Sequence, residues 1–164
     1  MNNNLLELIK LDASNISFYR KFDLAFEENL RNYQSRIYPN EEAEIVNWYY
    51  ITVEKRIVGS IWLEKEQSKS YAVLGIFIAE QQDRGKGIGK QAIIRIVEQD
   101  AVHMGINEIR LNVRENNKRA FNCYFALGFR EISRYKKPNG ISAITMGLSI
   151  DKHISNPNTY VRSL

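Results

Sequence analysis

A glycine-rich stretch with basic neighbours is the part of this sequence best suited to bind an anion. It runs from Glu80 to Lys90 and reads EQQDRGKGIGK. Glycine lets the backbone approach a ligand closely and adopt positive φ angles. Arg84, Lys86 and Lys90 add positive charge. The stretch therefore favours a phosphate or pyrophosphate ligand.

The segments on either side of this stretch predict where it lies in the fold. Residues 71–79 are apolar and β-branched, as in a buried strand. Residues 88–104 carry apolar side chains at helical spacing. The glycines thus lie where a strand turns into a helix. The first N–H groups of a helix lack intrahelical partners, and the helix dipole favours an anion there.

Two common phosphate loops do not match the spacing. A Walker A loop needs four residues between its glycines and a hydroxyl after its lysine, whereas three residues separate Gly85 from Gly89, and Gln91 follows Lys90. In a dinucleotide fingerprint the third glycine would come one residue later, and the loop would not lie in the middle of the chain.

The other elements follow from hydrophobic patterns and turn signals. We expect further strands over 5–11, 48–53, 57–63, 109–113, 129–135 and 141–148, and helices over 12–25 and 117–127. Residues 27–39 are irregular or a second short helix, and residues 41–46 form one more turn. Gly59 suggests a bulge or close packing. The strand over 71–79, its helix and the strand over 109–113 should form a parallel, right-handed βαβ unit.

Length and composition indicate one globular domain. The chain has 164 residues, and no apolar run approaches the length of a membrane helix. The single cysteine, Cys123, excludes an internal disulfide, and with no signal peptide we expect a cytoplasmic protein. Residues 1–83 carry a net charge of −4 and residues 84–164 one of +8. The basic half suits a polyanion, either a nucleic acid or a small phosphate-bearing molecule.

Two motifs resemble those of the GNAT superfamily of acetyl-CoA-dependent N-acetyltransferases. The first, Arg84-x-x-Gly87-x-Gly89, is similar to its acetyl-CoA loop. The second, Leu111-x-Val113-x3-Asn117-x2-Ala120-x3-Tyr124-x3-Gly128-Phe129, is similar to its second acetyl-CoA segment. The resemblance covers roughly residues 5–150 and looks nearest to bacterial acetyltransferases of protein N-termini and small amines.

This resemblance implies an α/β (α+β) fold: a mixed, mostly antiparallel sheet of six to seven strands, a central parallel βαβ unit and helices on both faces. Residues 1–150 would form the acetyltransferase domain and residues 151–164 a polar tail. The implied reaction transfers the acetyl group of acetyl-CoA to a primary amine by direct attack in a ternary complex. The implied partners are acetyl-CoA and an amine on a small molecule or peptide, with no nucleic acid, no membrane and a homodimer as one arrangement.

The resemblance also assigns residues to the cosubstrate. Backbone groups of Ile76, Phe77 and Ile78 would pair with the pantetheine amides, as an added strand would. Asn117 would bond to the cosubstrate, or serve only as the N-cap of its helix. The cosubstrate's pyrophosphate would lie on the loop, whose expected binding residues are Arg84, Gly85, Lys86, Gly87, Ile88, Gly89 and Lys90.

Tyr124 is the expected catalytic residue, because the resemblance puts it beside the thioester sulfur. Amine attack expels a thiolate, and a phenol can give it a proton. Without the motif, Tyr124 would be read as a core tyrosine on an amphipathic helix. Its neighbour Cys123 is expected to be a small buried hydrophobic residue rather than a nucleophile.

The sequence alone identifies neither the general base nor the acceptor that the pocket binds. The carboxylates of Glu28, Glu64, Glu66 and Glu80 are alternatives to water as the base. The acceptor pocket is expected from residues 26–40, which hold Tyr33 and Tyr38, from the turn after Ser133 and from Trp62. His103 and His153 are expected at the surface, and no cluster of residues suggests a metal site.

Two other functions use the same features. A non-catalytic acyl-CoA-binding regulatory module would keep the loop without needing Tyr124. A nucleic-acid-binding domain would use the basic segment from Arg110 to Lys137, although that segment contains no recognition motif.

Overall fold

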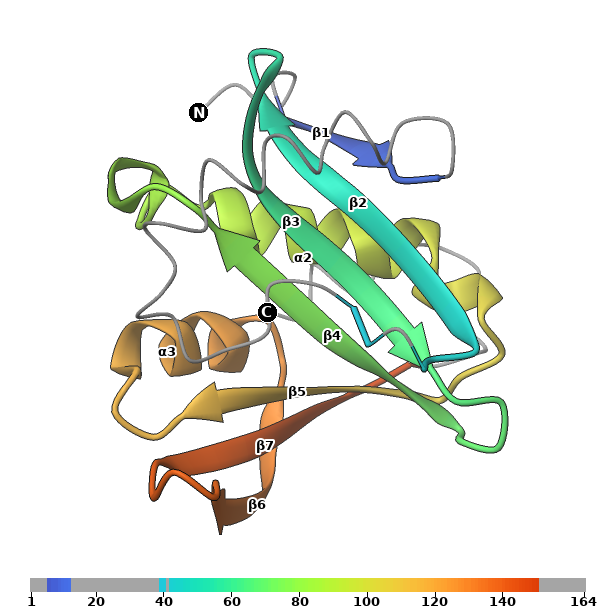
Figure 1. Cartoon of the computed structure of the whole chain (residues 1–164), viewed down its shortest axis with the longest axis vertical. Helices are drawn as coiled ribbons and strands as arrows, with labels where there is room; N and C mark the ends of the chain where they lie inside the picture. Colours follow the sequence, from blue (N-terminus) through green and yellow to red (C-terminus); the bar gives the residue numbers. More distant parts are fainter. Residues whose placement is uncertain (1–5, 13–38, 41, 151–164) are drawn as a thin grey trace.

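A seven-stranded mixed sheet organises the part of the chain that the computed structural model describes, residues 6–12, 39–40 and 42–150. Its strands lie in the order β1-β2-β3-β4-β5-β7-β6 (Figure 1). They are β1 (Leu6–Lys10), β2 (Ile45–Val53), β3 (Arg56–Lys65), β4 (Tyr71–Ile78), β5 (Glu108–Arg114), β6 (Arg130–Lys136) and β7 (Ser142–Ser149). Only β4 and β5 pair in parallel; the other neighbours are antiparallel. The mixed sheet and the parallel βαβ unit are confirmed.

Two α-helices follow β4 and β5 in the described residues: α2 (Ile88–Gln99) and α3 (Lys118–Ala126). In Figure 1, α2 lies behind the strands β2 to β4. Its buried residues Ala92, Ile93 and Ile96 join Leu63 and Leu74 of the sheet in the main hydrophobic core. The helix expected over residues 12–25, the segment 27–38 and the tail lie outside the described residues. None of the described helices is long and apolar enough to span a membrane.

The predicted helix over 88–104 is too long. The α-helix ends at Gln99, and a short 3-10 helix follows at Ala101–His103 (η2); another, Gln81–Asp83 (η1), precedes α2. Asp100, at φ −116° and ψ −45°, breaks the regular geometry between the two segments. Apolar spacing alone does not reveal this break, because Ala101 remains buried beyond it.

The β2–β3 hairpin also differs from the prediction. β2 begins at Ile45 rather than Trp48, because Ile45 and Val46 pair with the end of β3, so the predicted turn over 41–46 is wrong at these two residues. The hairpin loop is Glu54-Lys55, with φ angles of 50° and 64°, as in a type I′ turn. Its sequence lacks the asparagine or glycine that usually marks such a turn.

Gly59 lies beside a β-bulge and close to the backbone of a neighbouring strand, as its place inside a strand suggested. The β2–β3 register shifts beside it, between Ile51 and Thr52, as in a β-bulge. A Cβ atom on Gly59 would lie 2.1 Å from the carbonyl oxygen of Phe77 on β4. Both expected features, a bulge and a close backbone approach, are present.

Candidate active site

A cavity opens where β4 and β5 separate. The two strands pair only through Tyr71–Val73 and Glu108–Arg110. Beyond these residues the cavity, of about 600 Å³, lies between Leu74–Ile76 and Leu111–Arg114. The facing edges of the strands no longer bond to each other there, so backbone groups are available to a ligand.

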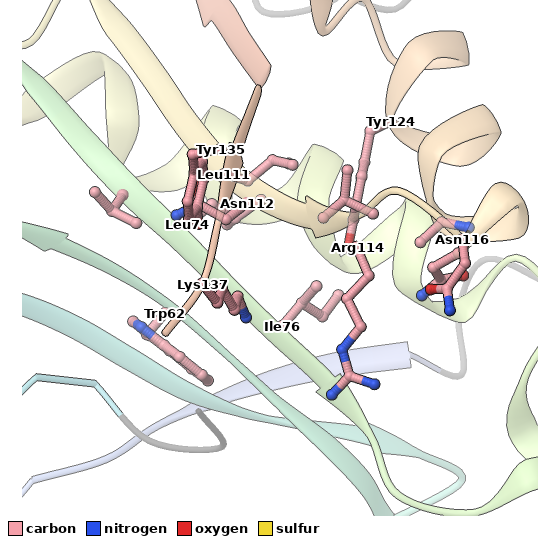
Figure 2. Close-up of a pocket in the computed structure, with 15 residues that line it drawn as sticks. Trp62, Leu74, Ile76, Leu111, Asn112, Arg114, Asn116, Tyr124, Tyr135 and Lys137 are labelled. Atoms are coloured by element: carbon pink, nitrogen blue, oxygen red, sulfur yellow. Dashed lines mark hydrogen bonds between the residues drawn. The ribbon is translucent and has the colours of Figure 1, made fainter. Parts of the chain in front are cut away.

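Side chains from four further segments complete this cavity (Figure 2). Asn116 and Asn117 come from the turn after β5, and Ala120 and Tyr124 from α3. Trp62 comes from β3; Tyr135 and Lys137 come from β6 and the residue after it. The described lining residues are Trp62, Val73, Leu74, Gly75, Ile76, Leu111, Asn112, Val113, Arg114, Asn116, Asn117, Ala120, Tyr124, Tyr135 and Lys137. The lining includes two basic side chains, Arg114 and Lys137, and no carboxylate among the described residues.

Tyr124 lines the cavity from α3. Its side chain extends from the helix toward β5 (Figure 2). The ring packs edge to face on Phe129, with centroids 6.1 Å apart, and the Phe129 backbone N–H donates to the Tyr124 carbonyl at 3.0 Å. The ring is partly buried, so it is held by packing while its edge reaches the cavity.

Asn117 is the N-cap of α3. Its Oδ1 accepts a hydrogen bond from the Ala120 backbone N–H at 3.2 Å. The residue also lines the cavity. The capping role is therefore present, while a bond from its amide to a ligand stays a prediction.

The loop before α2 leaves the helix N-terminus open. Gly87 is the N-cap residue, in a left-handed conformation with φ 80°, and no side chain caps this end. A Cβ atom on Gly87 would meet nothing within 4 Å, so its surface is clear. Gly85 also has positive φ, at 75°. The first N–H groups of α2, from Ile88 to Lys90, can thus face an anion.

Arg84 contacts the backbone of its own loop, and the phosphate contact that its charge suggested stays a prediction. Its guanidinium donates to the carbonyl oxygens of Ile78, at 3.1 and 3.2 Å, and Ala79, at 3.3 Å. Arg84 therefore fixes the chain at the end of β4. Of the three β4 residues expected to meet pantetheine, Ile76 lines the cavity, whereas Phe77 and Ile78 lie outside its lining.

Arg119 is a basic residue at this loop that sequence reasoning missed. Its guanidinium atoms lie 3.6–3.8 Å from the position that a Cβ atom on Gly85 would take. The start of α3 therefore adjoins the glycine loop, and the two sequence motifs meet. Its place two residues after the helix-capping Asn117 is the signal that could have suggested it.

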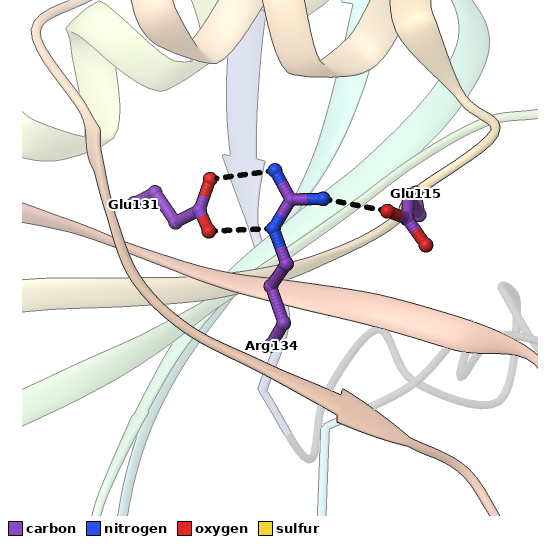
Figure 3. Close-up of polar contacts among 3 residues, drawn as sticks. All are labelled: Glu115, Glu131 and Arg134. Atoms are coloured by element: carbon purple, nitrogen blue, oxygen red, sulfur yellow. Dashed lines mark hydrogen bonds and ion pairs between the residues drawn. The ribbon is translucent and has the colours of Figure 1, made fainter.

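A surface ion-pair network supports the turn that carries Asn116 and Asn117 (Figure 3). Arg134 on β6 binds both carboxylate oxygens of Glu131, at 2.6 and 2.9 Å, and reaches Glu115 after β5 at 2.5 Å. The Arg134 guanidinium lowers the pKa of Glu131. All three side chains are exposed, so the network orients the turn more than it stabilises the fold.

The carboxylates considered as bases lie in different places. Glu64 is buried, accepts a hydrogen bond from the Asn40 backbone N–H at 2.6 Å, and lines a second cavity of about 330 Å³. Glu42, Glu44 and Glu66 also line this second cavity, and Val73 lines both. Glu66 is exposed, Glu80 is partly buried, and Glu28 lies outside the described residues.

Within the described residues, neither Cys123 nor His103 has the surroundings of a reactive group. Burial raises the pKa of the Cys123 thiol, which disfavours the thiolate. His103 is exposed, and His153 lies outside the described residues. Within residues 6–12, 39–40 and 42–150, no group of three metal-binding side chains occurs.

Comparisons with known proteins agree on one family. The model of the acetyltransferase (GNAT) family matches residues 7–129. An uncharacterized N-acetyltransferase of Bacillus subtilis, YycN, is 36% identical over 86 residues, which are 51% of this chain and 54% of that relative. The aligned stretch thus spans about half of the relative's length.

Solved structures share the fold at low identity. A Vibrio cholerae spermidine N-acetyltransferase in complex with CoA and spermine has a TM-score of 0.68 and 18% identity, covering 90% of this chain and 96% of that one. RimL, a ribosomal L7/L12 alpha-N-protein acetyltransferase in complex with CoA, has a TM-score of 0.73 and 16% identity, covering 92% and 97%. With the family match over most of the described sheet, this chain belongs to the GNAT family of acetyltransferases.

Proposed function

We propose that this chain transfers the acetyl group of acetyl-CoA to a primary amine by direct attack in a ternary complex. The observation that carries the proposal is the cavity between β4 and β5, which Tyr124 lines close to where α3 adjoins the glycine loop. One end of the site suits a pyrophosphate, and the cavity suits an extended amide chain.

Different residues around the cavity would bind different parts of the cosubstrate. The uncapped N–H groups at Ile88–Lys90 and the Arg119 guanidinium would hold the pyrophosphate. The edge of β4 at Ile76 would pair with the pantetheine amides, in the cavity that Asn117 also lines. This fit rests on the open surface of Gly87, where a side chain would block backbone approach.

Tyr124 is proposed as the general acid. The amine nitrogen forms a bond to the thioester carbonyl carbon, the carbon–sulfur bond breaks, and CoA leaves as a thiolate. Tyr124 gives that sulfur its proton and recovers one from water. The amine loses its protons to water or to a carboxylate, for which Glu64 is the buried candidate.

We propose the class of acceptor from the acceptors named for two structural neighbours. One neighbour acts on spermidine and another on a ribosomal protein N-terminus, so we propose a small amine or a peptide N-terminus here.

We also propose a cytoplasmic enzyme, consistent with its single cysteine. Self-association, as a homodimer, is supported by β6, an edge strand whose seven residues are all exposed; light scattering on the purified chain tests it.

Calorimetry and a CoA-release assay test the proposed function together. We expect CoA to bind at micromolar concentrations and to be released from acetyl-CoA when a suitable amine is added. Absence of CoA binding at millimolar concentration contradicts the proposal. Binding without transfer to any amine favours the regulatory module instead.

A further inference from the structure

The indole N–H groups of the two tryptophans differ in whether they have a hydrogen-bond acceptor. Trp48 Nε1 donates to Ser60 Oγ at 2.6 Å. Trp62, which pairs with Trp48 across β2 and β3, is 2% exposed, and its buried Nε1 has no hydrogen-bond partner. A buried donor without an acceptor is costly and rare in native proteins. The Trp62 N–H therefore needs an explanation that the fold itself does not supply.

Trp62 lies at the cavity of the candidate active site. Its indole edge next to Nε1 covers Gly75 on β4, where a Cβ atom would fall 2.0 Å from the ring atoms Cε2 and Cζ2. Both residues line the cavity. In Figure 2, Trp62 and Lys137 lie on the opposite side of the cavity from Asn116 and Tyr124. Trp62, with its buried and unpartnered N–H, thus lies at the end of the cavity away from α3.

We propose that the Trp62 N–H donates a hydrogen bond to an oxygen of the acceptor substrate and so selects the acceptor. The inference rests on the proposed function, in which the thioester lies beside Tyr124 and the amine comes from the other end. A ligand oxygen would give this buried donor the acceptor that the described residues do not supply. Trp62 would then be a specificity-determining residue for the transfer reaction.

The charges around Trp62 narrow the acceptor class. The described lining of this cavity holds Arg114 and Lys137 and no carboxylate. A protonated polyamine offers only donors and positive charge, so it can neither accept from the indole nor neutralise these side chains. An amine that carries a carbonyl, carboxylate or hydroxyl oxygen nearby can accept from the indole, and a carboxylate can in addition pair with these cations. A peptide N-terminus, with its first carbonyl close to the α-amine, belongs to this class.

Acidic side chains gather instead around the second cavity, beyond Val73. Glu42, Glu44, Glu64 and Glu66 line it together with Lys65 and Lys69, so the four carboxylates outnumber the two lysines. An ammonium group would be attracted there, whereas an oxygen acceptor would be attracted to Trp62. Val73 lines both cavities, so the acidic region adjoins the Trp62 end of the active-site cavity at this residue.

An isosteric replacement isolates the N–H group. Benzothienylalanine, installed at position 62, keeps the fused ring and replaces the N–H with sulfur; Trp62→Phe is the genetically simple second variant. The same replacement at position 48 is the matched control, because that N–H is already satisfied by Ser60. The probes are a short peptide with a free N-terminus and 1,4-diaminobutane, with acetyl-CoA as the donor.

We expect the position-62 replacement to raise the KM of the peptide about tenfold, the usual worth of one hydrogen bond, and to leave the KM of acetyl-CoA unchanged. The KM of the diamine should not change. Thermal stability should not fall, since no bond is lost in the free protein. The position-48 replacement should instead lower stability and leave both KM values alone.

Three results overturn the inference while leaving the proposed function standing. They are an unchanged KM of the peptide, a KM of acetyl-CoA that rises instead, or a wild-type preference for the diamine. If neither amine is acetylated, the proposed function fails for these acceptors. Calorimetry in the presence of CoA then decides the inference: equal affinity of the peptide for wild type and variant overturns it, and about tenfold weaker binding to the variant supports it.

Discussion

The carboxylate of Asp83 is held by both terminal nitrogens of Arg56, at 2.8 and 2.9 Å. Arg56 begins β3, and Asp83 ends the short helix η1 immediately before the glycine loop. Asp83 is 3% exposed, whereas the Arg56 side chain is 54% exposed. The hairpin of β2 and β3 is thus tied to the segment that leads into α2.

This ion pair predicts a pH-dependent stability. The hydrogen bond from Arg56 lowers the pKa of Asp83 from 3.8. A lowered pKa in the folded state gives stability that is present above the unfolded value and is lost as the pH falls through the folded value. We expect Asp83→Asn to lower the free energy of unfolding by roughly 1–2 kcal/mol at pH 7, a modest value because Arg56 is half exposed.

Urea unfolding of wild type and Asp83→Asn from pH 7 down to pH 2 measures this effect. The difference between the two proteins should begin to shrink below about pH 4, the value of the unfolded chain, and vanish as the pH falls through the lowered folded value. Glu131→Gln is the control, because its exposed pair with Arg134 should change stability little. A constant difference across this pH range would contradict an ionic role for Asp83.

We expect a glycine at position 87 to be needed for cosubstrate binding as well as for the left-handed backbone conformation of the turn. Gly87→Ala places a Cβ atom on the open face of the helix N-terminus, so we expect a CoA dissociation constant at least tenfold higher. Gly105→Ala is a matched control, since Gly105 also has positive φ, at 65°, and open space around it. Each change should cost roughly 1–2 kcal/mol of stability through backbone strain.

Calorimetric titration of CoA into both glycine variants separates strain from ligand contact. Equal losses of stability with weaker CoA binding only in Gly87→Ala fit the proposed role. If the two variants bind CoA equally well, Gly87 serves the turn alone.

Arg119 should contribute to the affinity for the polyanionic cosubstrate. We expect Arg119→Gln to weaken CoA binding about fivefold at low salt, the scale of an exposed ion pair, and less at high salt. Arg95→Gln removes the same charge from α2, two turns beyond the loop, and should have little effect. The check is CoA affinity measured at several salt concentrations. A salt dependence identical to that of wild type would exclude a phosphate contact by Arg119.

Local patterns predicted the elements that hold the site. The apolar run of β4, the glycines and the periodic face of α2 are contiguous in sequence, so the strand-to-helix junction followed directly. The N-cap at Asn117 was likewise a local feature, and its bond to Ala120 is present. Such signals depend on residues only a few positions apart.

Contacts between distant segments could not be predicted in this way. The pairs Arg56–Asp83 and Arg119–Gly85 join residues far apart in sequence, and nothing local marks either partner. Nor could the bonds from the Arg84 guanidinium to the carbonyls of Ile78 and Ala79 be predicted, and the phosphate contact that its charge suggested stays a prediction. The unpaired N–H of Trp62 depends on what surrounds a buried ring, which a sequence does not state.

Tyr124→Phe gives the most direct measurement of the proposed chemistry. The change removes one hydroxyl and keeps the ring that packs on Phe129. Thermal stability, CoA affinity and turnover should be measured on the same preparation, with Tyr135→Phe as the control from another tyrosine that lines the cavity. We expect turnover to fall by roughly 10²–10⁴-fold in Tyr124→Phe, with CoA affinity and stability nearly unchanged. Full turnover in a stable Tyr124→Phe protein would contradict Tyr124 as the general acid.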